Sequence, residues 1–405
     1  MSDKKIPTGI QLTPFDPDYL EDPYPVLREV RSADPFHHDV EMHRFFPSRY
    51  ADVKAILRDP DLLTDPNNSK PDSFARHFFS GDPDEEVSML MADEPRHRRL
   101  RRLVNELFKP KAVERWRERI EQIVQQHLDA IESVEFDLIS DYASPVPSVV
   151  IAEILGIPAD RQADFKRWSD MGAEAVFSPA PSEQAIADAI EGNRLMSAFL
   201  QQEISVRREH PRDDLISQLI ASEIEGDRLT DDEIISQCSL LLLAGNLTTT
   251  DMIGNGVRAL LENPQQLALL RDNPALIEDT VEEILRYDSP VLNSSRITHE
   301  DTERYGCPIE KGECLHVSLA AANHDPEVYE NPEAFDIRRP RIAHQSFGGG
   351  RHHCLGAFLA RMEGQIAILK LVQHVPNLAL SERGFEQKLA PEFRGMSYCW
   401  VTTNG

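Results

Sequence analysis

The sequence predicts a mainly α-helical fold with minor β-sheets, built around one long central helix. Three segments carry this prediction: a capped helix start at Thr230, a run of helical spacing that begins at Ala357, and short strand-like runs between Val291 and Ala322. No internal repeat and no clear linker divides the 405 residues. We therefore expect a single domain that spans residues 1–405.

Composition indicates a globular chain and argues against two classes of partner. Hydrophobic residues make up 40% and charged residues 28%, the balance of a protein that buries a core. The 43 basic and 69 acidic residues give a net charge of −26, which repels nucleic acid and anionic lipid. The longest apolar stretch, Leu240 to Gly245, is far shorter than a spanning helix, and the first ten residues lack a signal-peptide pattern. We expect a cytoplasmic monomer with no membrane anchor and no nucleic-acid partner.

The cysteines argue against a disulfide framework. They are odd in number and widely spaced, as expected in a reducing compartment. The five are Cys238, Cys307, Cys314, Cys354 and Cys399. The role of each cysteine is therefore inferred from its own sequence context.

The central helix is specified at both ends. Thr230-Asp-Asp-Glu233 is a capping box, and Leu229 can form a hydrophobic staple with Ile234. Asn263-Pro264 ends the segment, so a helix of about 32 residues would span about 48 Å. Its middle, LLLLAGNLTTT, is apolar all round and then carries a glycine and three threonines, which are poor helix formers. A local function must explain these residues.

The rest of the chain predicts a short helix, a small sheet and a final helix. ALIEDTVEEILRY reads as a helix that ends at Ser289-Pro290, and SRIT and CLHVSLAAA read as strands. AFLARMEGQIAILKLVQHV has helical spacing and directly follows IAHQSFGGGRHHCLG. Cys354 therefore lies where a glycine-rich loop becomes a helix.

The position of Cys354 is that of a prepared metal-ligating sulfur. Glycines permit a tight turn and a close approach of a flat ligand, and a helix N-terminus favours the thiolate. The alternatives are a small buried apolar cysteine and a zinc site, although the C-x₂₋₄-C spacing of zinc sites is absent. A dinucleotide fingerprint fails because Gly348-x-Gly350 has no third glycine at His353.

Phe347 to Gly356 read Phe-Gly-x-Gly-x-His-x-Cys-x-Gly, which resembles the haem-binding signature of the cytochrome P450 family. The resemblance implies that the Cys354 thiolate is the axial iron ligand of haem b (iron protoporphyrin IX). It implies that His352 binds a haem propionate and that Phe347 shields the sulfur. Gly348 and Gly356 belong to the same cofactor-binding loop. The implied fold is the P450 fold, with the long central helix over the haem.

Two further blocks match the family in order. Glu283-Ile-Leu-Arg286 is similar to its Glu-x-x-Arg pair, and Arg339 resembles the third member of a buried cluster that supports the haem loop, with Arg338 as the competing candidate. The segment from Asp93 to Arg102 resembles the helix beneath the haem. That match implies propionate contacts for His97 and Arg101, and Arg296 in SPVLNSSRIT resembles the family's remaining propionate-binding arginine.

The same segment is basic in an otherwise acidic protein. A local basic patch can steer an acidic partner against the global charge. We expect a ferredoxin-type partner to dock on the surface near Arg98–Lys111, formed by Arg98, Arg99, Arg102, Lys109 and Lys111.

Ala244-Gly-Asn-Leu-Thr248 resembles the oxygen-binding motif of the family's central helix. The match implies that Ala244 and Gly245 border the haem, and that the Thr248 hydroxyl hydrogen-bonds O₂. The family usually has an acid directly before this threonine, where this chain has Leu247. Asn246 and Asp251 are polar alternatives, the first on another helix face and the second nearly one turn away. The candidate catalytic residues are Thr248 and Asn246.

Family position also suggests the substrate pocket. Its expected lid is the loop from about Pro71 to Met89, with the segment around Phe177. The expected lining residues are Leu240, Leu243, Ala244, Leu247, Leu292 and Met396. An apolar ligand such as a terpenoid, steroid or fatty acyl chain is expected.

The resemblance implies a soluble, bacterial-type haem-thiolate monooxygenase that inserts one oxygen atom from O₂ into a small apolar substrate. No flavin or nicotinamide domain is visible, so a separate ferredoxin and reductase would supply the electrons. Leu247 suggests a peroxide-driven or otherwise atypical enzyme as a variant. A non-catalytic haem-binding protein on the same fold and a zinc-binding interaction module are the alternatives from other classes.

Overall fold

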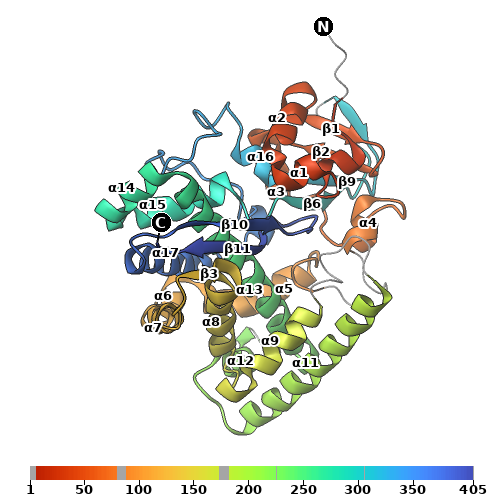
Figure 1. Ribbon diagram of the computed structural model, residues 1–405. Helices are drawn as coiled ribbons and strands as arrows, with labels where there is room; N and C mark the ends of the chain where they lie inside the picture. Colours follow the sequence, from red (N-terminus) through yellow and green to blue (C-terminus); the bar gives the residue numbers. More distant parts are fainter. Residues whose placement is uncertain (1–5, 80–87, 173–181, 225, 305, 405) are drawn as a thin grey trace.

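The computed structural model describes residues 6–79, 88–172, 182–224, 226–304 and 306–404 (Figure 1). The helices are α1 (Pro17–Glu21), α2 (Pro23–Ala33), α3 (Tyr50–Arg58), α4 (Phe74–Phe79), α5 (Arg96–Asn105), α6 (Pro110–Glu114), α7 (Arg117–Asp129), α8 (Pro145–Leu155), α9 (Gln162–Met171), α11 (Glu183–Glu209), α12 (Leu215–Ala221), α13 (Asp231–Glu262), α14 (Pro264–Asp272), α15 (Ile277–Tyr287), α16 (Leu319–Asn323) and α17 (Ala357–His374). The strands are β1 (Phe36–Asp39), β2 (Arg44–Pro47), β3 (Glu135–Asp137), β4 (Glu223–Ile224), β5 (Asp227–Arg228), β6 (Asn293–Ile297), β7 (Thr302–Arg304), β8 (Cys307–Ile309), β9 (Cys314–Ser318), β10 (Ala379–Gln387) and β11 (Met396–Thr402).

The strands form small sheets at the margins of the helical body. Within the described residues, the largest sheet has the order β1-β2-β9-β6, with β2 and β9 parallel and the other pairs antiparallel. A second sheet has the order β10-β11-β3. Figure 1 shows the first sheet beside α1, α2 and α3 at one end of the molecule, with α8, α9, α11 and α12 at the other. The predicted mainly α-helical class with minor sheets is confirmed.

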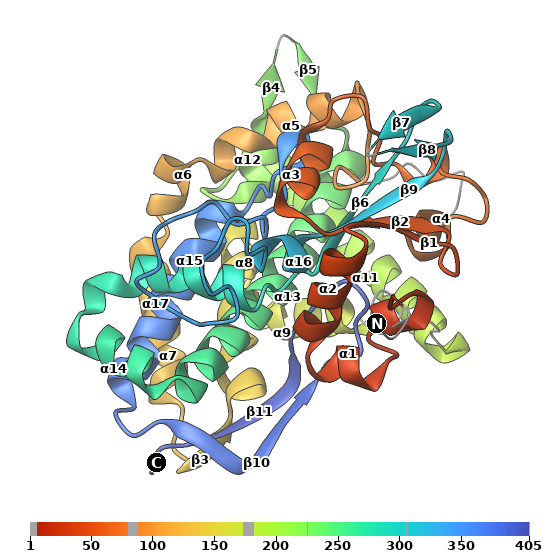
Figure 2. The same ribbon diagram turned by 90° about the horizontal axis from the view of Figure 1, so that it is seen from above.

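The predicted central helix is confirmed as α13, which has 32 residues. At its start, the Thr230 amide donates to Glu233 Oε2 at 2.9 Å and the Glu233 amide donates to Thr230 Oγ1 at 3.2 Å. These two reciprocal bonds satisfy amides that have no partner inside the helix. α13 lies in the middle of the molecule in both views (Figures 1 and 2).

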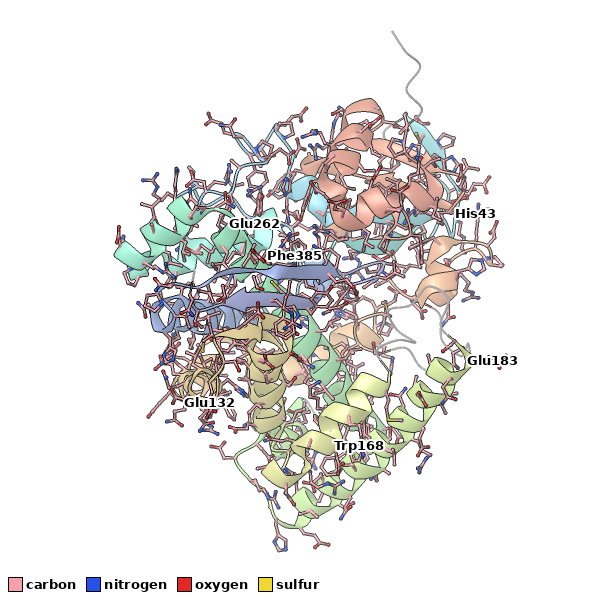
Figure 3. The ribbon with its side chains drawn as sticks, viewed as in Figure 1. His43, Glu132, Trp168, Glu183, Glu262 and Phe385 are labelled. Atoms are coloured by element: carbon pink, nitrogen blue, oxygen red, sulfur yellow. The ribbon has the colours of Figure 1, made fainter. Side chains whose placement is uncertain are left out.

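One large hydrophobic cluster surrounds α13 and joins it to α7, α8, α15 and α17. At the far end of this cluster, Trp168 of α9 lies 5.7 Å from the ring of Phe199 on α11 (Figure 3). A smaller cluster packs α3 against the first sheet. The core therefore holds α13 on several sides and fixes the orientation of its faces.

The predicted strand CLHVSLAAA is only half correct. Cys314–Ser318 is β9, but the chain turns directly into α16 over Leu319–Asn323. The Ser318 side chain caps this helix by accepting a hydrogen bond from the Ala321 amide at 3.2 Å, and alanine favours helix. The short helix predicted from ALIEDTVEEILRY is confirmed as α15, and the final helix as α17.

One described helical stretch, Leu138–Leu155, is long and apolar enough to cross a membrane. It consists of a π-helical turn over Leu138–Ala143 followed by α8, and 67% of it is buried inside the protein. This burial against α13 and α7 is that of a core helix.

Candidate active site

The loop before α17 needs its glycines. Gly348 and Gly350 have positive φ angles of 65° and 66°. A Cβ atom on Gly350 would lie 2.4 Å from the Leu57 carbonyl oxygen, so a larger residue would clash with the α3 backbone. The Cys354 amide closes the loop by donating to the Phe347 carbonyl at 2.9 Å. The loop thus holds the Cys354 backbone firmly before α17 begins.

The thiol of Cys354 is accessible and is also surrounded by protein groups that shift its pKa. Its side chain is exposed, yet the surrounding protein raises the pKa of the thiol by burial. The Gly356 amide, Arg101 and Arg361 act in the opposite direction without outweighing it. The Gly356 amide at the helix N-terminus thus lowers the pKa of the thiol as predicted, and burial raises it by more. A metal ion would be needed to hold the sulfur deprotonated.

One face of α13 is open although the helix crosses the core. Ala244 is exposed, and four residues that share its face are partly exposed. These four are Leu240, Leu243, Leu247 and Thr248. Thr248 Oγ1 donates to the Ala244 carbonyl at 2.8 Å. We call this face the open face of α13; it is apolar except for one hydroxyl group.

The open face and Cys354 belong to neighbouring elements. α13 packs against α17, the helix that directly follows the loop of Cys354. Gly245 packs beside α8, where an added Cβ atom would lie 3.5 Å from the Ile151 side chain.

Four basic side chains converge next to the cysteine loop. The rings of His97 and His352 have centroids 4.0 Å apart. Burial and the neighbouring His97, Arg296, Arg351 and Arg101 lower the pKa of His352 to about 2, and burial lowers the pKa of Arg296 to about 10. Burial likewise lowers the pKa values of His97 and Arg101. We call His97, Arg101, Arg296 and His352 the basic cluster.

The basic cluster has more cationic groups than acids beside it. Arg101 donates to the His353 carbonyl at 2.8 Å, and Arg296 donates to the Ser295 carbonyl at 2.7 Å. His97 Nδ1 and His352 Nε2 are buried and make no hydrogen bond among the described residues. Glu94 is the acid nearest to His97, at 3.9 Å. Buried donors without partners are costly, so this cluster fits a ligand that carries carboxylates, as haem does with its two propionates.

The Glu-x-x-Arg pair forms a buried three-residue cluster. Arg286 donates to both oxygens of Glu283 at 2.8 Å, and the Arg339 Nε lies 3.2 Å from each of them. Arg338 is exposed and makes no contact with this carboxylate. Arg339 is therefore the arginine that completes the cluster. Arg286 also bonds the carbonyls of Asn323 and Ala334, which ties α15 to the segment before the cysteine loop.

Three predicted site residues lie elsewhere. Asn246 points from α13 toward α8, where its Oδ1 accepts a hydrogen bond from Ser148 Oγ at 2.7 Å. Leu292 is buried in the cluster with Leu12, and Met396 is buried in the main core. None of the three joins the open face, because helix periodicity and tertiary packing direct them away. The catalytic role of Asn246 and the pocket roles of Leu292 and Met396 stay predictions.

The predicted lid is described only in part. Phe177 lies outside the described residues, as do residues 80–87 of the segment from Pro71 to Met89. Of the remainder, Phe74 and Met89 are buried.

The predicted docking surface is partly neutralised by internal ion pairs. Arg98 pairs with Glu94 at 3.0 Å, Lys109 with Glu106, and Arg99 with Asp227 and Glu233. Arg98, Arg102, Lys109 and Lys111 are exposed, whereas Arg99 is only partly so.

Arg361 was missed by the sequence reasoning. Its guanidinium carbon lies 4.4 Å from the ring centroid of Phe347, and its Nε donates to Glu282 at 2.6 Å. Its position one turn into the helix that follows the cysteine loop is the sequence signal that could have identified it. Phe347 is thereby fixed between a cation and the loop that it begins.

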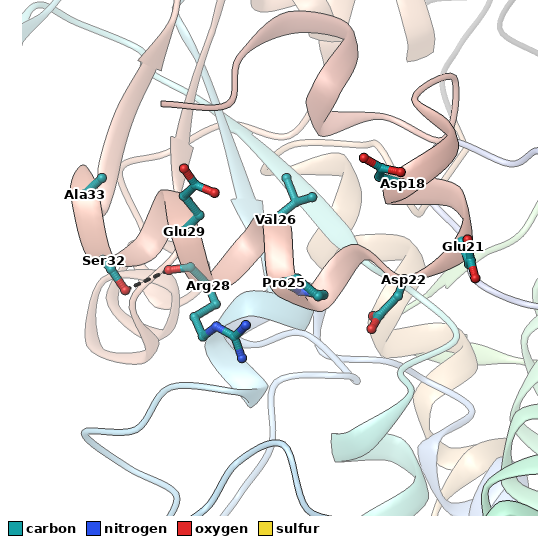
Figure 4. A pocket seen from close by; sticks show the side chains of 9 residues that line it. All are labelled: Asp18, Glu21, Asp22, Pro25, Val26, Arg28, Glu29, Ser32 and Ala33. Carbon is teal, nitrogen blue, oxygen red and sulfur yellow. Dashed lines mark hydrogen bonds between the residues drawn. The ribbon is translucent and has the colours of Figure 1, made fainter. Parts of the chain in front are cut away.

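A surface groove between α1 and α2 is separate from these features (Figure 4). Its lining residues include Asp18, Glu21, Asp22 and Glu29, and none of the residues of the basic cluster or the open face. Its only dashed contact is the bond from Ser32 Oγ to the Arg28 carbonyl at 2.8 Å. The groove is acidic, and nothing in it points to a ligand.

Comparisons with known proteins agree on one family. The profile of the family described as Cytochrome P450 matches residues 48–389. Cytochrome P450 CYP107DY1 of Priestia megaterium is 40% identical over 343 residues, which cover 82% of this chain and 83% of that protein.

Two solved structures share the fold. P450BioI in complex with an acyl carrier protein ligated to hexadec-9Z-enoic acid is 34% identical, with a TM-score of 0.85 and coverage of 95% of this chain and 99% of that one. CYP109E1 from Bacillus megaterium in complex with corticosterone is 30% identical, with a TM-score of 0.86 and coverage of 96% and 100%.

Proposed function

The chain belongs to the cytochrome P450 family of monooxygenases, and we propose that it inserts one oxygen atom from O₂ into a small apolar organic substrate. We further propose that residues 1–405 act as one haem domain. The bound haem supplies the activation of O₂, which no amino-acid side chain can perform alone. The polypeptide binds the haem, orients the substrate and delivers protons.

The basic cluster is the observation that carries the proposal. His97, Arg101, Arg296 and His352 bring donors together, and the ion pair of His97 with Glu94, at 3.9 Å, leaves the buried His97 Nδ1 and His352 Nε2 without a hydrogen bond among the described residues. In the proposed enzyme these four bind the propionates of haem b. Cys354 would hold the iron, and Phe347, Gly348, Gly356, Ala244 and Gly245 would border the haem. Glu283, Arg286 and Arg339 support the loop without touching the cofactor.

The open face of α13 supports an apolar substrate. Leu240, Leu243, Ala244 and Leu247 offer hydrocarbon surface with only Thr248 as a polar group. Two structures of relatives, one with an acyl chain on its carrier protein and one with corticosterone, support an acyl or steroid ligand. We propose that such a molecule packs against these residues.

Shifts of the haem Soret band test the substrate class. Titration of the haem-loaded protein with hexadec-9Z-enoic acid, corticosterone and a terpenoid should give a saturable shift with at least one of them. Leu243→Asn should weaken that binding, because it places an amide against an apolar ligand. The matched control is Ile190→Asn on the outer surface of α11, which should not weaken it. A shift with none of the apolar compounds but with a sugar or an amino acid would contradict the proposal.

We propose that a ferredoxin-type protein delivers the electrons at the surface near Arg98–Lys111. The four exposed cations there support this site, although Arg98 and Lys109 also pair with acids of the chain. Leu247 on the open face favours one alternative, a peroxide-driven enzyme, because no acid occupies this position. Product formation with hydrogen peroxide alone, at a rate equal to that with NAD(P)H, reductase and ferredoxin, would favour the alternative.

A further inference from the structure

Asp251 of α13 is a buried carboxylate, and one of its two oxygens has a hydrogen-bond partner while the other has none among the described residues. Its side chain is 1% exposed. Lys388, which directly follows β10, donates to Oδ1 at 2.5 Å, while Oδ2 is buried and has no hydrogen-bond partner among the described residues. A Cβ atom on Gly395 would lie 1.9 Å from Oδ1, so the glycine lets the backbone before β11 close over the carboxylate. The turn between β10 and β11 thus encloses Asp251.

Helix geometry places Asp251 next to the open face. It follows Leu247 by four residues and Thr248 by three, and residues at these spacings lie on one side of a helix with Cβ atoms about 5–6 Å apart. Asp251 therefore continues the open face by one turn beyond the hydroxyl of Thr248. Thr248 Oγ1 donates to Ala244 and Asp251 Oδ1 accepts from Lys388, so a proton path between the two side chains requires one bridging water molecule. The partnerless Oδ2 is the kind of buried atom that such a water satisfies.

Lys388 connects this carboxylate with solvent. Its side chain is 24% exposed while its Nζ contacts Asp251. Burial raises the pKa of Asp251 to about 6; Lys388 opposes this rise and Asp288 adds to it. The protonated and ionised forms are therefore both populated near neutral pH. A general acid works best when its pKa lies near the working pH.

We propose that Asp251 is the proton donor that replaces the acid missing at Leu247, and that it acts through Thr248. Asp251 passes a proton to the bridging water, the water passes one to Thr248 Oγ1, and Thr248 releases its own hydroxyl proton toward the open face. The lone pairs of the Thr248 oxygen accept the proton from the water, and the Thr248 O–H, which donates to the Ala244 carbonyl at rest, turns to the open face to release its own proton. Lys388 then returns a proton to the carboxylate and recovers one from solvent.

The proton count matches the reaction. Insertion of one atom of O₂ into a C–H bond uses two electrons from NAD(P)H and two protons, and the second oxygen atom leaves as water. The path therefore operates twice for each product formed. This inference rests on the proposed monooxygenase function, and Asp251 is a proton-delivering residue that acts through another group.

Asp251→Asn is the first test, because it keeps the size of the side chain beside Gly395 and removes the ionisable group. The ratio of product formed to NAD(P)H consumed should fall about tenfold, with the electrons lost to peroxide. Haem content and the spectrum of the reduced, carbon-monoxide-bound protein should not change. Leu247→Asp added to Asp251→Asn should restore most of the ratio. If Asp251 served only as a structural link between α13 and the β10–β11 turn, a carboxylate at position 247 would not restore this ratio.

A second readout needs no turnover. The folded pKa of Asp251 lies above the value of an unfolded chain, so this group stabilises the fold at low pH and loses that contribution as the pH rises from about 4 through about 6. The melting temperature of Asp251→Asn should therefore rise relative to the wild type as the pH goes from 5 to 8. A constant difference between the two proteins over this range would contradict the raised pKa.

Glu392→Gln is the matched control. Glu392 lies in the same turn, and its Oε2 is also buried without a partner, but it is not part of α13. Glu392→Gln should keep the wild-type ratio of product formed to NAD(P)H consumed. If Asp251→Asn keeps the wild-type ratio, the proposal is overturned while the monooxygenase function stands. If the wild-type protein itself forms no product, the proposed function fails instead.

Lys388→Gln covers the case in which Asp251→Asn does not retain haem. It leaves Asp251 in place and removes the link to solvent, so the ratio should fall about threefold at pH 8, where few carboxyl groups remain protonated. Leu247→Asp should reverse this loss. An unchanged ratio in Lys388→Gln would overturn the proposal.

Discussion

The rings of His97 and His352 lie 4.0 Å apart, with 36° between their planes, although one belongs to α5 and the other to the cysteine loop. Two basic side chains in contact repel each other when protonated, and Arg101 and Arg296 add positive charge beside them. Glu94, at 3.9 Å from His97, is one acid against these four groups, so the fold loses stability unless a dianion joins them. The propionates of the proposed haem would supply that charge.

Arg296→Met tests this account. In the haem-free protein, removal of a buried cation without a carboxylate partner should raise the free energy of unfolding by about 1–3 kcal/mol. In the haem-loaded protein, the same change should speed the transfer of haem to an acceptor protein. Arg304→Met is the control, because Arg304 has an acid partner in Asp59, so its loss should destabilise the fold without releasing haem. The account fails if Arg296→Met destabilises the haem-free protein and leaves haem transfer unchanged.

The buried cluster at Glu283 predicts a large loss of stability. Glu283→Gln should lower the free energy of unfolding by about 3–5 kcal/mol, because it leaves Arg286 and Arg339 without their carboxylate. Arg338→Ala, at the exposed neighbour, should stay within about 0.5 kcal/mol of the wild type. Denaturant unfolding of the three proteins measures both changes. If Glu283→Gln and Arg338→Ala changed the free energy of unfolding equally, the cluster at Glu283 would make no specific contribution to stability.

Local signals predicted the long elements well. Thr230, Glu233 and Pro264 define both ends of α13 within the sequence itself, and the structure confirms the helix. The strand predicted over Leu319–Asn323 was wrong because the side chain of Ser318 caps a helix there.

Tertiary contacts were beyond the reach of the sequence. Arg338 and Arg339 are adjacent, and only the folded chain shows which one meets Glu283. The pairing of Asp251 with Lys388 joins residues 137 positions apart, so no spacing rule could reveal it. Family position predicts that Leu292 and Met396 line the pocket, and the structure shows which apolar clusters bury them, which no local pattern reveals.

The hydroxyl of Thr248 should govern how efficiently electrons are used. Thr248→Ala removes the only polar group of the open face, so the ratio of product formed to NAD(P)H consumed should fall. Leu247→Asp should raise the ratio in the wild-type background, at some cost in melting temperature from a partly buried charge. Both variants are compared with substrate bound and with the melting temperature checked in parallel. An unchanged ratio in a folded Thr248→Ala protein would exclude the hydroxyl from proton delivery.

The proposed docking surface predicts a salt-dependent defect. Arg98→Glu combined with Lys111→Glu should slow electron transfer from the ferredoxin at low ionic strength, with a smaller defect as salt screens the field. Arg98 is suitable because its side chain is 70% exposed. Arg194→Glu on α11, whose side chain is 63% exposed, is the control on another surface. The same rate for the double variant and the wild type at every ionic strength would contradict docking at this surface.

The central claim is that Cys354 is the axial ligand of haem iron, and the absorbance spectrum of the reduced, carbon-monoxide-bound protein tests it most directly. Thiolate donation should place the band near ~450 nm in the wild type and in the control Cys307→Ser, and Cys354→Ser should lose it. A band of the imidazole type alone in freshly folded wild-type protein, or a band near ~450 nm that survives in Cys354→Ser, would contradict the assignment.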